Sequence, residues 1–94
     1  MTDETKAAVR KAFNVGRILF FMGSNKYNKL LKATSEVRLS KTKVDSFIKE
    51  GRSTEEAMVY VLRDMYGEAA ISAGFTRKQG IAMLEYAAML EELK

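Results

Sequence analysis

Polar and apolar side chains alternate over a short stretch in the middle of this chain. On an extended backbone, Thr34, Glu36 and Arg38 fall on one side, while Val37 and Leu39 fall on the other. An arginine fork can hold O6 and N7 of guanine, and a glutamate can accept from N4 of cytosine. A threonine can bond a base edge or touch a thymine methyl group. One side of the stretch therefore has the chemistry to contact bases, and the other suits a hydrophobic core.

Groups that suit phosphates stand at two predicted helix starts. Lys41 and Lys43 follow the alternating stretch directly, and Arg52, Ser53 and Thr54 follow a glycine. The start of a helix offers free backbone N–H groups and the positive end of its dipole to an anion. Lysines beside phosphates position a protein without reading the base sequence. Both helix starts therefore have the chemistry to hold an anion.

Several kinds of chemistry are excluded by composition. The chain has no cysteine and no histidine, so disulfides, thiolate metal sites and Ser-His or Cys-His nucleophiles cannot form. We find no phosphate loop and no nucleophile–base pair, and the carboxylates are scattered. Apolar runs such as residues 18–22 are far shorter than the ~18 residues of a membrane span. The sequence predicts a cytoplasmic protein that is not an enzyme and uses no metal or cofactor.

Charge is distributed unevenly along the 94 residues, whose formal net charge is +4. Residues 1–33 carry seven Lys or Arg against two Asp or Glu, a balance of +5. Residues 34–53 carry five against three, and residues 54–94 carry four against seven. The basic part is suited to an anionic partner, which by itself favours nucleic acid only slightly.

The elements that must position these groups are mostly helices. Each predicted helix start has a side-chain oxygen that can cap a free N–H group; these residues are Thr2 or Asp3, Ser24, Ser40, Ser53 and Thr76. Helix ends are predicted at Gly23, Gly51 and Gly74, and Gly67 predicts a bend or a restart. Only residues 36–39 have the alternation of a strand. We expect one mainly α domain over residues 1–94.

The order of these elements over residues 34–66 resembles the ribbon-helix-helix family of DNA-binding proteins. The match consists of Val-Arg-Leu-Ser at residues 37–40 before one helix, and Gly-Arg-Ser at residues 51–53 before the next. The resemblance implies that the lone strand pairs antiparallel with that of a second copy, and that this ribbon enters the major groove. Residues 1–33 and 67–94 would then be helical extensions outside the family core.

The resemblance also assigns roles to the polar residues. Bases would be contacted by Thr34, Glu36 and Arg38. Phosphates would be contacted by the residues at the two helix starts, which are Lys41, Lys43, Arg52, Ser53 and Thr54. The implied function is sequence-specific binding of double-stranded DNA by a homodimer, or by a higher assembly on tandem sites. Such proteins regulate transcription, often on plasmids or phages.

A second DNA-binding arrangement is open over residues 68–83. Ala70 and Gly74 have the spacing of the small residue and turn glycine of a helix-turn-helix motif, and residues 77–79 would open its recognition helix. Gly80 stands where that motif wants an apolar core residue, and the local charge is acidic. The alternative without DNA is a plain helical hairpin in the core.

A third class of function is a helical adaptor or inhibitor that binds a protein partner. Phe20, Phe21 and Met22 form a cluster that could supply a hydrophobic contact surface if it were exposed. Burial of the same residues in a dimer is the simpler interpretation.

Overall fold

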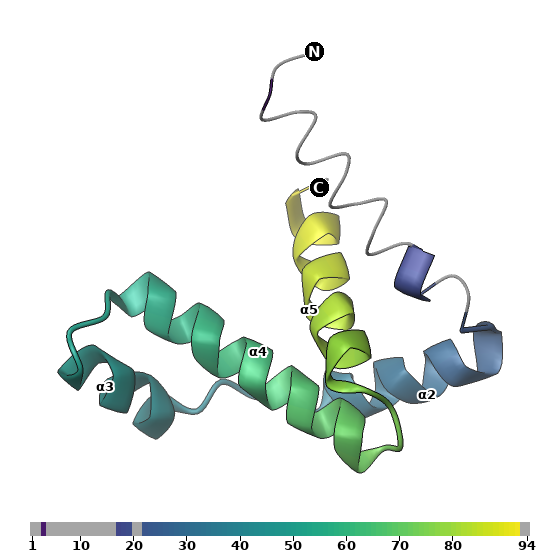
Figure 1. Cartoon of the computed structure of the whole chain (residues 1–94), viewed down its shortest axis with the longest axis horizontal. Helices are drawn as coiled ribbons and strands as arrows, with labels where there is room; N and C mark the ends of the chain where they lie inside the picture. Colours follow the sequence, from purple (N-terminus) through teal and green to yellow (C-terminus); the bar gives the residue numbers. More distant parts are fainter. Residues whose placement is uncertain (1–2, 4–16, 20–21, 93–94) are drawn as a thin grey trace.

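The structure consists of helices joined by short connections. The computed structural model describes residues 3, 17–19 and 22–92. Four helices lie within the described residues: α2 over Ser24–Ser35, α3 over Lys41–Lys49, α4 over Thr54–Ser72 and α5 over Arg77–Glu92 (Figure 1). The prediction of a mainly α fold is confirmed. Most of the first predicted helix lies outside the described residues.

The predicted strand over residues 36–39 is not formed in the described part of the chain. Thr34 still belongs to α2, where its hydroxyl donates to the carbonyl oxygen of Leu30 at 2.9 Å. Glu36 is the C-cap of that helix, with helical φ and ψ of −85° and −8°. Residues 37–40 then run without regular structure into α3. A strand needs a ladder partner for its backbone groups, and a single copy of this short stretch has none.

Local capping sets most of the helix boundaries as predicted. The hydroxyl of Ser40 accepts from the N–H of Lys43 at 3.4 Å. Ser53 does the same for Glu56 at 3.2 Å. The start of α5 is capped reciprocally: the Gln79 side chain accepts from the Thr76 N–H at 2.9 Å, and the Thr76 hydroxyl accepts from the Gln79 N–H at 3.2 Å. Positive φ values of 98° at Gly51 and 89° at Gly74 end the preceding helices.

Two boundary predictions are corrected. The N-cap of α2 is Gly23, not Ser24, and no side chain caps it. Helix α4 does not restart at Gly67 but continues without a break to Ser72. The side chain of Arg77 lies directly over Gly67, so that a Cβ there would come within 2.8 Å of the Arg77 Cγ. The glycine therefore makes room for a neighbouring element instead of ending the helix.

Helices α4 and α5 pack closely because of a second glycine. Gly80 is buried, and a Cβ at this position would overlap the backbone carbonyl oxygen of Tyr66 and lie 2.7 Å from the Cβ of Ala70. Only a residue without a side chain permits this approach of the two backbones. Gly80 is a weak point of the helix-turn-helix alternative, whereas in this fold it is the point of contact between two helices.

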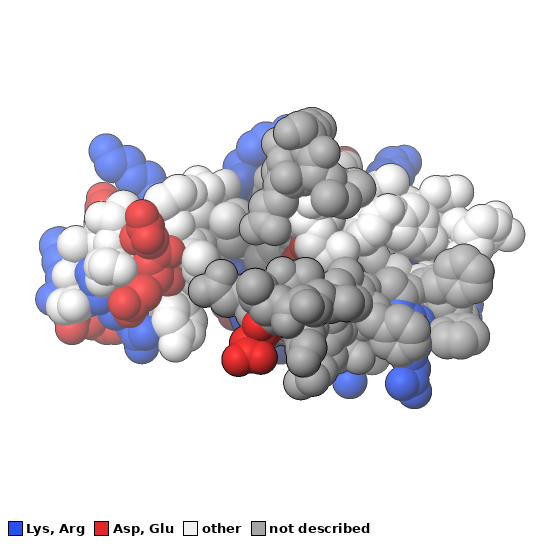
Figure 2. Space-filling view, turned by 90° about the horizontal axis from the view of Figure 1, so that it is seen from above, with Lys and Arg blue, Asp and Glu red and all other residues white. Residues whose placement is uncertain are grey.

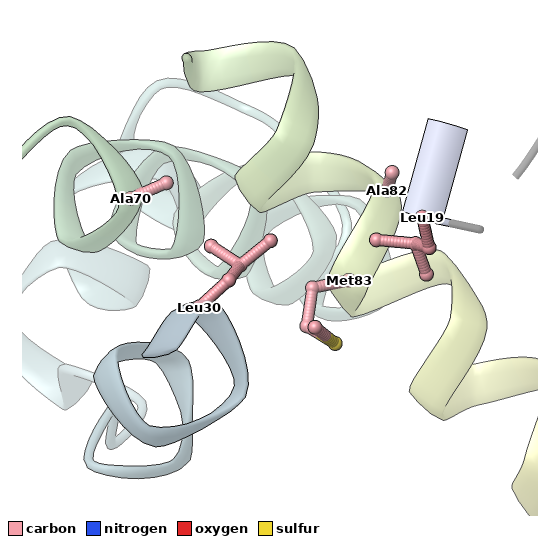
Figure 3. Close-up of a cluster of buried hydrophobic side chains, with 5 residues drawn as sticks. All are labelled: Leu19, Leu30, Ala70, Ala82 and Met83. Carbon is pink, nitrogen blue, oxygen red and sulfur yellow. The ribbon is translucent and has the colours of Figure 1, made fainter. Parts of the chain in front are cut away.

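Helix α4 joins two separate hydrophobic clusters, at opposite ends of its length (Figure 1). At one end, α3 and the first half of α4 form a helical hairpin, and we call this the hairpin end. Three residues are buried there, which are Val44, Ala57 and Val61. At the core end, α2, α5 and the second half of α4 meet around five buried residues: Leu19, Leu30, Ala70, Ala82 and Met83 (Figure 3). Ala57 and Val61 face α3, while Ala70 faces α2 and α5. Helix α4 therefore changes its buried face along its length.

Candidate nucleic-acid interface

The three predicted base-contacting residues differ in their exposure. Thr34 is only 2 % exposed, and its hydroxyl is bonded to carbonyl oxygens of the preceding turn of α2. Glu36 and Arg38 are both exposed. Thr34 cannot reach a ligand in this arrangement, so the accessible part of the predicted set is Glu36 and Arg38.

Arg38 is held against the chain that surrounds it. Its Nη1 donates to the carbonyl oxygens of Ser35 at 2.8 Å and of Val37 at 3.0 Å. A guanidinium has further N–H donors, which these two contacts do not use. Beside it Val37 is half-buried, while Leu39 keeps 39 % of its surface exposed. The connection between α2 and α3 thus presents a cation next to an uncovered apolar side chain.

The starts of α3 and α4 differ in their attraction for an anion. The first turn of α3 has no acidic residue, and Lys41 and Lys43 are exposed there. The first turn of α4 contains Glu55 and Glu56, which already complement the helix dipole. Of the two predicted phosphate sites, the start of α3 is therefore the more favourable one.

Arg52, predicted to contact a phosphate, packs on two aromatic rings. Its guanidinium carbon lies 4.2 Å from the ring centroid of Tyr60 and 5.5 Å from that of Phe47. The two rings are stacked, with their centroids 6.0 Å apart. This arrangement joins α3 to α4 through a cation–π contact, worth about 0.5–1 kcal/mol at an exposed site. The pairing of Phe47 with Tyr60 cannot be predicted from the sequence, because it depends on how the two helices pack.

Ion pairs and unpaired cations lie in different parts of the described chain. All three ion pairs found among the described residues connect α4 and α5: Arg63 with Glu85 at 3.9 Å, and Arg77 with Asp64 at 3.3 Å and with Glu68. The hydrogen bond that Arg77 donates to Glu68, followed by the charge of Glu68 and the contacts with Asp64, raises the pKa of Arg77 above its usual value.

By contrast, residues 17–44 hold seven Lys or Arg and a single acidic residue, Glu36. In the part of the chain that the structure describes, none of these seven cations forms an ion pair. The space-filling view shows Lys and Arg side chains at both ends of the molecule, with acidic side chains beside them over α3 and the start of α4 (Figure 2). The positive charge of residues 17–44 is thus available to an external anion.

The helix-turn-helix alternative has the right connection but an unsuitable surface. Helix α4, the turn at residues 73–76 and α5 form a helix–turn–helix unit in which Ala70 is fully buried and Gly74 has positive φ. However, Arg77 at the start of α5 is bonded to carboxylates of α4. Arg77, which would open the recognition helix, therefore contacts α4 and not an external ligand.

The hairpin end also exposes apolar side chains. Within α4, Met58 is 37 % exposed, Val59 53 % and Tyr60 49 %, and Ile48 of α3 is 38 % exposed. The sequence holds a signal for this surface, since residues 57–62 are six apolar residues in succession. Such a run covers more than the one face that a single neighbouring helix can bury.

The aromatic cluster predicted as an adaptor surface is only partly described. Phe20 and Phe21 lie outside the described residues. Met22 is half-buried and packs against the buried cluster at the core end. Among the described helices, none combines the length and apolar character that crossing a membrane requires.

Comparison with protein families, with curated proteins and with solved structures gave no match to this chain.

Proposed function

We propose that this protein binds double-stranded DNA as a homodimer and regulates transcription. The observation that carries the proposal is the positive charge of residues 17–44, which has no ion-pair partner within the described part of the chain, with Arg38 exposed within it. Arg38, Lys41 and Lys43 stand together around the connection from α2 to α3, where the first turn of the helix has no carboxylate. A duplex offers a dense row of phosphates to such a segment, together with base edges that an arginine can read.

Base contacts in this proposal come from Arg38 and Glu36. Arg38 exchanges its two contacts with backbone carbonyls for a guanine, and Glu36 accepts from a cytosine. Antiparallel pairing of residues 36–39 with a second copy would give the backbone of this stretch its missing ladder partner. Thr34 joins the contacting face only if the last turn of α2 unwinds, because its side chain is buried in the helix.

A second copy would also cover apolar surface at the hairpin end. One chain buries only three residues there and leaves Leu39, Met58 and Val59 exposed. Complete burial of a Val, Leu or Met side chain stabilises by about 1.5–3 kcal/mol. Homodimerisation through this end therefore complements a thin hydrophobic cluster, as expected for a small domain.

The proposal is tested with DNA that the full chain itself selects from a random-sequence pool. Arg38→Ala should remove discrimination between the selected duplex and a scrambled one, a loss of about 1–3 kcal/mol measured by fluorescence anisotropy. Lys49→Ala removes an exposed cation from the last turn of α3 and is the matched control, which should leave discrimination unchanged. Failure of the unaltered protein to bind any duplex at low salt would refute DNA binding.

A protein partner is the second candidate, favoured by the exposed Met58, Val59 and Tyr60. Under this alternative the same apolar residues contact a different protein, and the free chain is a monomer. Sedimentation at micromolar concentration separates the two functions. A monomer that also ignores DNA would support the adaptor, and a dimer that binds DNA would exclude it as the main role.

A further inference from the structure

Helix α2 concentrates positive charge without any internal compensation. Its 12 residues include Lys26, Lys29 and Lys32 and no acidic residue. All three lysines are exposed. Side chains three residues apart are neighbours on a helix, so these like charges repel one another along α2. An anion bound across the lysines would relieve this repulsion.

The side of α2 next to these lysines fixes the helix to the rest of the fold. Leu30 is fully buried and extends from α2 toward α4 and α5 (Figure 3). Thr34 is buried one turn later, and Tyr27 packs against the same cluster. The helix ends at Ser35, only three residues before Arg38. The lysines are therefore carried on a docked helix that leads directly into the proposed DNA-contacting segment.

We propose that Lys26, Lys29 and Lys32 form a second DNA-contacting surface, which holds backbone phosphates that flank the site read by Arg38. This inference rests on the proposed function. Lysines act on phosphates as point charges and do not read bases. Helix α2 thus contributes affinity and lengthens the contacted duplex, while sequence discrimination stays with the connection before α3.

The test compares two double variants of the full chain with equal charge. Lys29→Gln/Lys32→Gln removes two lysines from α2, and Lys49→Gln/Lys78→Gln removes two exposed lysines from α3 and α5. Each lowers the formal net charge from +4 to +2. Glutamine has nearly the helix propensity of lysine, so the helices are retained. Binding is measured by fluorescence anisotropy over a salt series, on a selected duplex of about 30 bp and on one trimmed to about 10 bp, roughly one turn.

On the long duplex, the α2 variant should lower the slope of log Kobs against log salt by about 2, since each lost phosphate contact removes about 0.9. The control variant should keep the slope of the unaltered protein. On the trimmed duplex, the α2 variant and the unaltered protein should have the same slope, because the flanking phosphates are missing. Lys29→Arg/Lys32→Arg keeps both charges and should restore the slope on the long duplex.

Equal slopes for the two glutamine variants on the long duplex would overturn this inference and leave DNA binding through Arg38 intact. A difference that persists on the trimmed duplex would overturn the flanking position of the contact. If the unaltered protein binds no duplex but binds vesicles of an anionic lipid, the proposed function fails, and the lysines act on a membrane surface instead.

Discussion

The two ends of α4 differ in how completely they bury their apolar side chains. At the core end, α2, α4 and α5 enclose a buried cluster together with the short segment around Leu19. Gly80 lets the backbones of α4 and α5 approach each other, and arginines of these two helices pair with carboxylates. At the hairpin end, two helices bury three residues and leave apolar side chains on the surface. The core end buries the larger cluster within one chain, although Leu31 and Ile71 are exposed there. The exposed apolar side chains of the hairpin end are the surface on which we propose the dimer contact.

The largest expected effect concerns the core end. Leu30→Ala should lower the free energy of unfolding by about 2–5 kcal/mol, because Leu30 is fully buried among three helices. Val61→Ala is the counterpart at the hairpin end and should cost about 2 kcal/mol, since it removes about two CH₂ equivalents at ~0.8 kcal/mol each and leaves a small cavity. Urea unfolding followed by circular dichroism measures both.

Amide hydrogen exchange sharpens this comparison. Val61→Ala should speed exchange mainly in α3 and the first half of α4, whereas Leu30→Ala should speed it in α2, α5 and the second half of α4. Equal acceleration throughout the chain in both variants would mean that the two ends unfold as one unit, and the distinction between them would be lost.

The second prediction concerns the two glycines at the core end. Gly80→Ala should destabilise the fold by about 2–3 kcal/mol, because the new Cβ overlaps the carbonyl oxygen of Tyr66. This oxygen is fixed in the backbone of α4 and cannot shift as a side chain can. Gly67→Ala meets only the side chain of Arg77, which can shift, and alanine favours a helix by about 1 kcal/mol over glycine. The change at Gly67 should therefore be within about 1 kcal/mol of neutral in urea unfolding. A cost at Gly67 equal to that at Gly80 would contradict the close packing of α4 on α5.

The third prediction tests the hairpin end as a dimer contact. Val59→Asp should weaken self-association by about 10–100-fold in analytical ultracentrifugation, which corresponds to the 1.5–3 kcal/mol for burial of one such side chain. Ile71→Asp is the matched control, because Ile71 is another exposed apolar residue of α4, at the core end, with 46 % of its surface exposed. Ile71→Asp should leave association unchanged. Equal weakening by the two variants would show that association does not depend on the hairpin end.

What the sequence predicts well depends on neighbours within one helical turn. The caps at Ser40, Ser53 and Thr76 are recognisable because their partners lie three residues away along the chain. The apolar spacing likewise predicts a mainly α fold. These features need no knowledge of how the helices meet.

The remaining features arise from contacts between elements. The burial of Thr34 depends on how α2 docks, and the role of Gly80 depends on where α5 crosses α4. The alternation over residues 36–39 favours a strand only if a second strand is present to pair with it. The sequence of one chain does not show whether such a strand is present. Arg52 was assigned to a phosphate from its place in the Gly-Arg-Ser turn, but the packing of α3 on α4 directs it onto two rings.

The smallest expected effect measures that contact and bears on how firmly the hairpin end is held. Arg52→Ala and Tyr60→Leu should each weaken the hairpin, and a double-mutant cycle in urea unfolding should give a coupling of about 0.5–1 kcal/mol. Tyr60→Phe keeps the ring face and should keep most of the coupling, whereas leucine keeps apolar bulk without it. Because the contact is a charge on a ring and not an ion pair, the coupling should change little when salt is raised. A coupling near zero would mean that Arg52 does not interact with the Tyr60 ring. Its guanidinium would then be free to contact a DNA phosphate, as predicted from the sequence.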